Sequence, residues 1–155
     1  MKILIFSDTH GDFRKVSAAI KKHPDAEILV HCGDGEDQSR QMKLNYPDKM
    51  VIRVRGNCDL GSSLPEEEYF TVFGKKIMVT HGHNYGVKYG KASLKQEAVK
   101  QGYDIVFFGH THDPYNEYEN GVYLFNPGQG FGWFATYGVA EITESGSILL
   151  SHAKV

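Results

Sequence analysis

Cysteine is scarce in this sequence, and that scarcity limits both the covalent framework and the setting of the protein. Only two cysteines occur among 155 residues, and no Cys-x-x-Cys pair is present. Two separate thiols do not provide the disulfide framework that stabilises small secreted domains. We therefore expect a reducing, cytoplasmic setting.

Long apolar runs and excess basic charge are also missing. No apolar run approaches the about 20 residues that a membrane span requires. The N-terminal stretch MKILIFSDTH is not typical of a signal peptide. The formal net charge is -2 with neutral histidines, whereas a groove for long nucleic acid needs a basic stripe. We therefore expect no membrane partner and disfavour long nucleic acid as a partner.

The chain likewise lacks linkers, internal repeats and low-complexity tracts. Its hydrophobic content is 41% and its charged content 23%, which are values of an ordinary globular protein. A chain of this length can bury a real core. We therefore predict a single domain over residues 1–155.

The first half of the sequence alternates between strand and helix patterns. Continuous apolar runs rich in β-branched residues are typical of buried parallel strands, and apolar residues at helical spacing separate them. The predicted strands span residues 3–6, 27–31 and 50–54, and the predicted helices span residues 13–20 and 36–44. This alternation predicts a parallel sheet covered by helices.

The second half is dominated by paired strands. Hairpins are predicted for residues 69–80, 115–125 and 133–152, each with a glycine in its turn. An amphipathic helix over 91–101 and a buried strand over 104–108 lie between the first two. We therefore predict an α/β fold with two packed sheets and helices outside.

Polar residues follow every buried strand of this prediction. Parallel α/β sheets place their sites beyond the carboxyl ends of strands, so these side chains should converge although they are far apart in sequence. They are Asp8, His10, Asp34, Asn57, His81, His110 and His112. Alone, each has an ordinary structural reading as a turn, a helix cap or a partly buried histidine. Together, at five strand ends, they indicate a site.

These residue types favour divalent metal ions. Two carboxylates, one amide and four imidazoles offer oxygen and nitrogen ligands without any thiolate. Such a set suits Mn²⁺, Ni²⁺, Fe²⁺, Zn²⁺ or Co²⁺ and is too rich in nitrogen for Ca²⁺. Seven ligands exceed one ordinary site but fit two metal ions that share a carboxylate.

Read in order, these motifs resemble the signature of the calcineurin-like metallophosphoesterases: Asp8-x-His10, Gly33-Asp34, Gly56-Asn57, His81 and Gly109-His110-x-His112. The small size and the stretches GNCD and NPGQ are similar to the compact YfcE-type phosphodiesterase subgroup. The resemblance implies a four-layer αββα sandwich of two mostly mixed sheets. It also implies two divalent metal ions, with Mn²⁺ favoured and Asp34 as the bridging ligand. The two implied ligand sets are Asp8, His10, Asp34 and His112 for one metal, and Asp34, Asn57, His81 and His110 for the other.

The resemblance further implies hydrolysis of phosphoesters by a metal-bridging hydroxide that attacks phosphorus directly. Asn57, His81 and His110 would then belong to the catalytic centre. We predict a phosphodiesterase that acts on small or nucleotide-like diesters. One alternative is a non-catalytic interaction scaffold, which is how the retromer coat uses the same fold with a degraded metal site. A nuclease for long DNA or RNA is a third reading. Homo-oligomer formation stays open.

Cys58 departs from the pattern of the family, in which many members carry histidine after the Gly-Asn pair. A thiol is a weaker hydrogen-bond donor than imidazolium and is never a cation. We expect Cys58 to line the phosphate pocket as a nearly neutral group, which favours diesters over the more highly charged monoesters. His83 is either the proton donor of this pocket or a surface residue.

Four further features carry weaker expectations. Asp59 is predicted to hold its loop, and Asp37 either orients a metal ligand or caps the following helix. Asn126 to Gly128 should form a turn near the rim of the site. The aromatic run 131–134 is read as core, with a subunit interface as the alternative.

Overall fold

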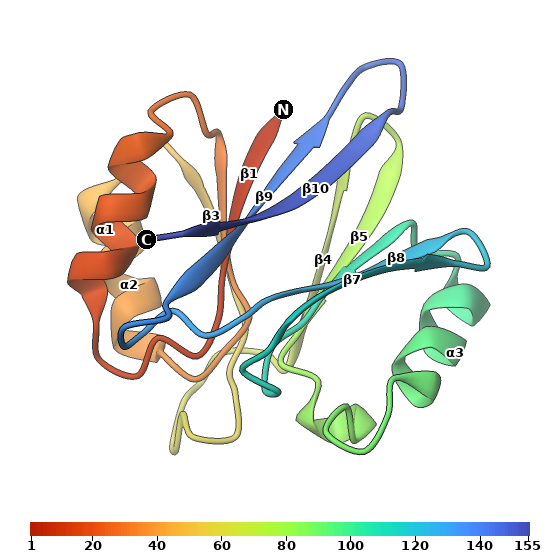
Figure 1. Ribbon diagram of the computed structural model, residues 1–155, viewed down its shortest axis with the longest axis horizontal. Coiled ribbons are helices and arrows are strands. Elements are labelled where there is room, and N and C mark those ends of the chain that lie inside the picture. Colours follow the sequence, from red (N-terminus) through yellow and green to blue (C-terminus); the bar gives the residue numbers. More distant parts are fainter.

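The computed structural model describes residues 1–155, which form two five-stranded sheets with helices on their outer faces (Figure 1). The helices are α1 (Phe13–Lys22), α2 (Glu36–Asn45), the short 3₁₀ helix η1 (His83–Tyr85) and α3 (Ala92–Gln101). The strands are β1 (Lys2–Phe6), β2 (Ile28–His31), β3 (Met50–Arg53), β4 (Glu67–Val72), β5 (Lys75–Thr80), β6 (Ile105–Phe107), β7 (Pro114–Glu119), β8 (Val122–Pro127), β9 (Thr136–Ile142) and β10 (Ile148–Lys154).

Both sheets are mixed and have parallel strands at their centre. The first has the order β10-β9-β1-β2-β3, in which β1, β2 and β3 are parallel and β9 runs antiparallel to β1. The second has the order β4-β5-β6-β8-β7, with β5, β6 and β8 parallel. Antiparallel hairpin partners form its two edges. The β1, β2, β3, β5, β6 and β8 strands are therefore the ones whose carboxyl ends can contribute to a shared site.

Three hydrophobic layers hold the structure together. The largest lies between the sheets and contains 16 buried residues from both, including Ile5, Val30, Val79 and Phe107. A second layer packs α1 and α2 on the first sheet, and a third packs α3 on the second sheet. Figure 1 shows the resulting order of helix, sheet, sheet and helix. The predicted four-layer αββα sandwich is confirmed.

Helix α1 illustrates how local sequence gives this packing. Val16, Ala19 and Ile20 recur at helical spacing and are buried against the first sheet, while Lys21 and Lys22 lie in the last turn. Positive charge at that end interacts favourably with the negative pole of the helix dipole. None of the helices has the length and apolar character needed to span a membrane.

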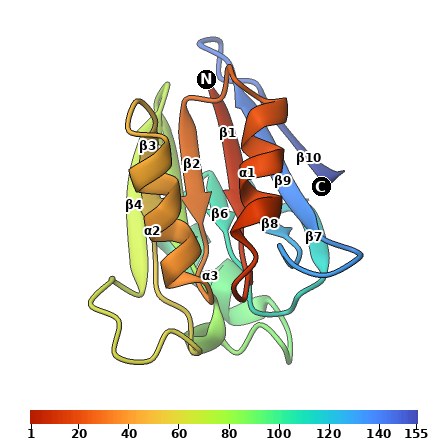
Figure 2. The same ribbon diagram turned by 90° about the vertical axis from the view of Figure 1, so that its left-hand side faces the viewer.

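The loops that follow the parallel strands gather at one end of the molecule. Figure 2 shows this end below the sheets, with α1 and α2 in front of the first sheet. The opposite end carries the turn between β9 and β10 and the N-terminus. Convergence of distant segments at one end is what the strand-end pattern predicted.

The expected core position of residues 131–134 is wrong. Strand β9 begins at Thr136 rather than at Trp133, and the residues before it form a loop. The side chains of Trp133 and Phe134 are 99% and 81% exposed. Glycines interrupt the aromatic residues, and Gly132 has a φ of 75°, which a continuous strand cannot accommodate.

His31 is a buried structural histidine, and it should make stability depend on pH. Its ring contacts Thr9 Oγ1 at 3.0 Å and accepts the Gly33 N–H at 3.2 Å. Burial lowers the pKa of His31 from 6.5 to about 4. His31 therefore binds a proton near pH 6.5 in the unfolded chain but only near pH 4 in the folded chain. The free energy of unfolding consequently falls as the pH drops from about 7 toward 4.

We expect His31 to account for about 2 kcal/mol of lost unfolding free energy between about pH 7.5 and pH 5. Urea unfolding at both pH values measures this loss. His31→Gln should reduce the loss by that amount. His23→Gln is the matched control, because His23 is also a histidine in a side-chain contact, with its imidazole 3.0 Å from the Tyr137 hydroxyl. Identical pH dependence in wild type and His31→Gln would contradict the assignment.

Candidate metal centre

The seven residues singled out from the sequence come from five loops at the same end of the molecule. Asp8 and His10 follow β1, Asp34 follows β2, Asn57 follows β3, His81 follows β5, and both His110 and His112 follow β6. The structure brings six of these into two groups: Asp8, His10 and His112 form one, and Asp34, His81 and His110 form the other. Within each group one ligand atom per residue lies within 4.8 Å of the others.

The first group joins the end of β1 to the end of β6. The carboxylate of Asp8 is fully buried, and its Oδ1 lies 3.2 Å from Nε2 of His112. Its Oδ2 accepts hydrogen bonds from the hydroxyl of Ser7 at 2.6 Å and from the backbone N–H of His110 at 3.0 Å. The His10 ring lies 5.4 Å from the His112 ring. One oxygen of Asp8 is thus fixed by the protein while the other faces the histidines.

The second group surrounds the buried imidazole of His81. Its Nε2 lies 3.3 Å from Oδ2 of Asp34 and 3.2 Å from Nδ1 of His110. The amide oxygen of Asn57 lies 3.1 Å from the same nitrogen. Asn57 therefore joins this group, as the ligand sets implied by the family resemblance require. Sharing of Asp34 between two metal ions stays a prediction.

A backbone contact fixes the orientation of His81. Its Nδ1 lies 2.8 Å from the carbonyl oxygen of Cys32, which can only accept a hydrogen bond. Nδ1 must therefore carry a proton, and Nε2 is the ring nitrogen directed at Asp34, Asn57 and His110. Metal-binding histidines in proteins are usually oriented by such a contact on the other ring nitrogen.

Backbone strain is concentrated at the same residues. Seven non-glycine residues have positive φ, and five of them belong to the two groups. These five are Asp8 (51°), His10 (39°), Asp34 (56°), His110 (69°) and His112 (65°). Each such conformation costs roughly 1–3 kcal/mol and persists only where the surrounding structure enforces it, commonly at functional sites.

Two glycines allow the loops to approach each other closely. A Cβ atom at Gly56 would lie 2.0 Å from Oδ1 of Asp34, and one at Gly109 would lie 1.9 Å from Oγ of Ser7 and 2.8 Å from Oδ2 of Asp8. All three distances are below van der Waals contact. These positions require glycine because the backbone passes directly beside the carboxylates.

Asp59 connects two of the loops, as the sequence analysis predicted for a residue that holds its loop. Its carboxylate accepts four backbone hydrogen bonds at 2.8–3.0 Å, and the donors are the N–H groups of Asp34, Gly35, Glu36 and Gly56. It also lies at the N-terminus of α2, where negative charge is favoured. Asp37, by contrast, is exposed and pairs with Arg40.

The charges at the second group are set by mutual contact. Burial disfavours the charged carboxylate of Asp34, but the contact with His81 outweighs it and lowers the pKa of Asp34. Burial opposes protonation of His81 too, yet Asp34 and Asp8 raise its pKa above 6.5. Burial and the nearby His81 lower the pKa of His110 to about 4. Asp34 is therefore a carboxylate, and His110 is neutral, at neutral pH.

Cys58 and His83 both lie near the second group but contact different members of it. Cys58 is exposed and lines a cavity of about 370 Å³ together with His10 and Asp34. The adjacent Asp34 raises the pKa of the Cys58 thiol to about 11, so the thiol is neutral at neutral pH. The His83 ring lies 5.4 Å from the His81 ring, and its buried Nδ1 has no hydrogen-bond partner. Both proposed roles in a substrate pocket stay predictions.

The residues present fit a pair of divalent metal ions. Oδ1 of Asp8 is buried, makes no hydrogen bond and faces His112. A buried carboxylate oxygen without a partner is costly unless a cation or a donor satisfies it. Two clusters of carboxylate oxygen and imidazole nitrogen supply the ligand types that first-row divalent metals prefer.

Sequence reasoning missed the supporting contacts of Ser7 and Phe131, and it placed Asn126 only in a turn near the rim of the site. The Ser7 hydroxyl holds Asp8, and Asn126 donates hydrogen bonds from Nδ2 to the carbonyl of Gly109 at 2.8 Å and to Oγ1 of Thr111 at 3.1 Å. Phe131 places its ring edge-on against His10 at 5.1 Å. Only the contact of Ser7 could have been predicted from the sequence, since Ser7 directly precedes Asp8. The other contacts join segments that are far apart in the sequence.

Comparison with known proteins agrees with this geometry. Residues 1–145 match the model of the calcineurin-like phosphoesterase superfamily domain. The probable metallophosphoesterase YsnB of Bacillus subtilis is 34% identical over 129 residues, which cover 83% of this chain and 74% of YsnB. The phosphodiesterase MJ0936 of Methanocaldococcus jannaschii is 30% identical over 150 residues, covering 86% of each chain. The phosphodiesterase YfcE of Escherichia coli is 26% identical over 152 residues, covering 83% of this chain and 78% of YfcE.

Solved structures share the fold. Wild-type Vps29 from Entamoeba histolytica, determined as a complex with Zn²⁺, superposes with a TM-score of 0.77 at 20% identity and covers 99% of both chains. At that identity the likeness concerns the fold alone. Together with the relatives above, it confirms the resemblance that the strand-end motifs indicated.

Proposed function

Because this chain belongs to the calcineurin-like phosphoesterase superfamily, we propose that it is a phosphodiesterase that uses two divalent metal ions to hydrolyse small or nucleotide-like diesters. One observation carries the proposal: six of the seven predicted ligand residues form two clusters, each of which joins strand ends of the first sheet to strand ends of the second. Two such clusters are what a catalytic site of this kind needs, and five of the ligands hold strained backbone conformations that an interaction surface does not require.

Divalent cations bound by these residues would lower the pKa of water toward about 7 and offset the charge on the phosphoryl oxygens. The protein prepares this chemistry by holding its donors in fixed geometry. The Ser7 hydroxyl and the His110 backbone N–H orient Asp8, and the Cys58 backbone N–H donates to Oδ1 of Asp34 at 2.8 Å. Mn²⁺ is our preferred metal, with Ni²⁺, Fe²⁺, Zn²⁺ or Co²⁺ as alternatives.

A screen of metals against substrates tests the proposal. Purified protein loaded with each metal should hydrolyse bis-p-nitrophenyl phosphate, and metal analysis should find two ions per chain. Asn57→Ala and His81→Ala should lose both activity and one equivalent of metal. Protein that holds no metal and hydrolyses no phosphodiester, yet binds a protein partner, would instead support the scaffold reading suggested by the fold shared with Vps29.

Cys58 should contribute to the choice between diester and monoester. Its thiol is neutral and lines the cavity, so it offers no cation to the second negative charge of a phosphomonoester. Cys58→His should raise activity on p-nitrophenyl phosphate relative to bis-p-nitrophenyl phosphate, by roughly tenfold if imidazolium contributes one charged hydrogen bond. The ratio of the two kcat/KM values is the measurement, and an unchanged ratio would remove Cys58 from the account of specificity.

The acidity of the protein argues for small substrates and against long nucleic acid. Binding of long DNA or RNA would show a steep loss of affinity with rising salt, because released counterions drive such binding. We expect no such binding in a titration at low and moderate salt. A cytoplasmic location belongs to the same proposal, whereas homo-oligomer formation stays open.

A further inference from the structure

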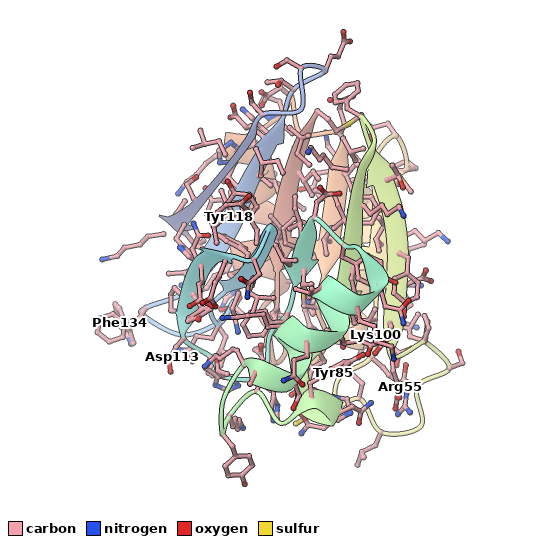
Figure 3. The ribbon with its side chains drawn as sticks, turned by 90° about the vertical axis from the view of Figure 1, so that its right-hand side faces the viewer. Arg55, Tyr85, Lys100, Asp113, Tyr118 and Phe134 are labelled. Atoms are coloured by element: carbon pink, nitrogen blue, oxygen red, sulfur yellow. The ribbon has the colours of Figure 1, made fainter.

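The loop between β8 and β9, residues 128–135, carries two highly exposed aromatic side chains and contacts the candidate metal centre. Trp133 is 99% exposed and Phe134 is 81% exposed. Figure 3 shows Phe134 projecting outward from this loop, away from the body of the molecule. Large aromatic side chains left in water at adjacent positions do not contribute to the core, and they commonly mark a binding surface.

The base of this loop is fixed to the first metal-ligand group. The backbone N–H of Gly130 donates to the carbonyl oxygens of Ser7 at 2.9 Å and Asp8 at 3.2 Å. A Cβ atom at Gly130 would lie 2.7 Å from Cγ2 of Thr9, so only glycine permits this approach. The loop is therefore held against the end of β1, from which Asp8 and His10 project.

Phe131 connects the loop to the histidines themselves. Its ring lies edge-on to His10 at 5.1 Å and to His112 at 5.9 Å. Trp133 is two residues further along, and two residues of chain span at most about 7 Å. The backbone of Trp133 therefore lies at most about 7 Å from that of Phe131, whose ring contacts the first ligand group.

The loop also has the composition of a stacking surface. Residues 128–135 read GQGFGWFA and include no charged side chain. A contact with a second phosphate would need lysine or arginine, whereas a flat base needs only an aromatic face. Because every nucleobase has such a face, stacking tolerates different bases.

From this placement we propose that Trp133 and Phe134 stack on a nucleobase of the substrate, so that the preferred diesters are nucleotide derivatives rather than simple alkyl esters. This inference rests on the phosphodiesterase function proposed above. It assigns specificity to a loop that neither the metal ligands nor the cavity beside Cys58 includes. Base identity should matter little, whereas presence of a base should matter much.

Fluorescence gives a direct test, because Trp133 is the only tryptophan of the chain. With Zn²⁺ as a diamagnetic metal, titration with AMP should quench the emission with a saturable curve. Ribose 5-phosphate, which has the same phosphate and sugar without the base, should leave the emission unchanged. Equal responses to the two compounds, or none to either, would overturn the proposal. This readout does not depend on turnover.

Kinetics provide the second test, with two substrates that share a leaving group. Trp133→Ala should lower kcat/KM for thymidine 5′-(p-nitrophenyl phosphate) by roughly tenfold and for methyl p-nitrophenyl phosphate by less than about twofold. Leu149→Ala, which removes a 64% exposed side chain from β10, is the matched control and should affect neither.

The outcomes separate this inference from the proposed function. Equal kcat/KM losses on both substrates, or no loss on either, refute base stacking and leave the phosphodiesterase proposal intact. Failure of the wild type to hydrolyse every diester refutes the phosphodiesterase proposal instead, while AMP quenching still reports on stacking. A blue shift of Trp133 emission with protein concentration, without a nucleotide effect, would assign the loop to contact between copies and overturn the inference.

Discussion

Asp34→Asn should abolish phosphodiester hydrolysis, with a loss of roughly 10³-fold or more in kcat/KM. Asparagine keeps the shape of aspartate and an oxygen that can accept the Cys58 N–H, so the loop should stay in place. It removes the negative charge that lies 3.3 Å from His81 in the second ligand group. The measurements are hydrolysis of bis-p-nitrophenyl phosphate and metal content, which should fall to one ion per chain or fewer.

A matched carboxylate elsewhere shows whether the effect is local. Asp25→Asn removes the same charge from an exposed residue that pairs with Lys2 near the opposite end of β1, so activity should stay within about twofold of wild type. An Asp34→Asn protein with wild-type activity and two bound ions would refute the role of Asp34 as a ligand. A loss of activity together with unfolding would be visible in circular dichroism and would call for a gentler variant, Asp34→Glu, which retains the charge at a shifted position.

Asp59→Ala should lower the free energy of unfolding by about 3–5 kcal/mol. Its carboxylate accepts four backbone hydrogen bonds from two separate loops, and alanine leaves those N–H groups without a partner. Hydrogen bonds to charged groups are each worth about 1.5–3 kcal/mol, and water replaces part of what is lost. Urea unfolding at neutral pH measures the change.

The same variant should weaken metal binding, because Asp59 positions Asp34 without reaching the metals itself. Asp59→Asn retains one acceptor oxygen, so it should recover part of the unfolding free energy and part of the metal affinity that Asp59→Ala loses. Asp113→Ala, at an exposed residue outside this network, is the control and should change stability by less than about 0.5 kcal/mol. A loss below about 1 kcal/mol for Asp59→Ala would show that the four hydrogen bonds are dispensable.

Much of the fold could be predicted because local patterns agree with tertiary requirements. The apolar run of β1 is buried on both faces, as a central parallel strand must be, and residues of α1 at helical spacing form one buried side. The prediction for the residues before β9 failed because local propensity and tertiary contacts disagree there. Aromatic residues such as Trp133 have strand propensity, but the closely spaced glycines around them and the tether of Gly130 to Ser7 and Asp8 decide the local conformation.

The sequence by itself determined the chemistry of the site, because residue type alone fixes which atoms can bind a metal ion. Oxygen and imidazole donors at strand ends, without thiolates, already indicated divalent cations. The residue types alone did not divide the donors between two groups; the family resemblance implied a division, and the tertiary structure provides its physical cause. His112 lies against Asp8, while His110, two residues away, lies against His81. That division depends on how the two sheets pack and on left-handed backbone turns at the ligands, which packing between distant segments enforces.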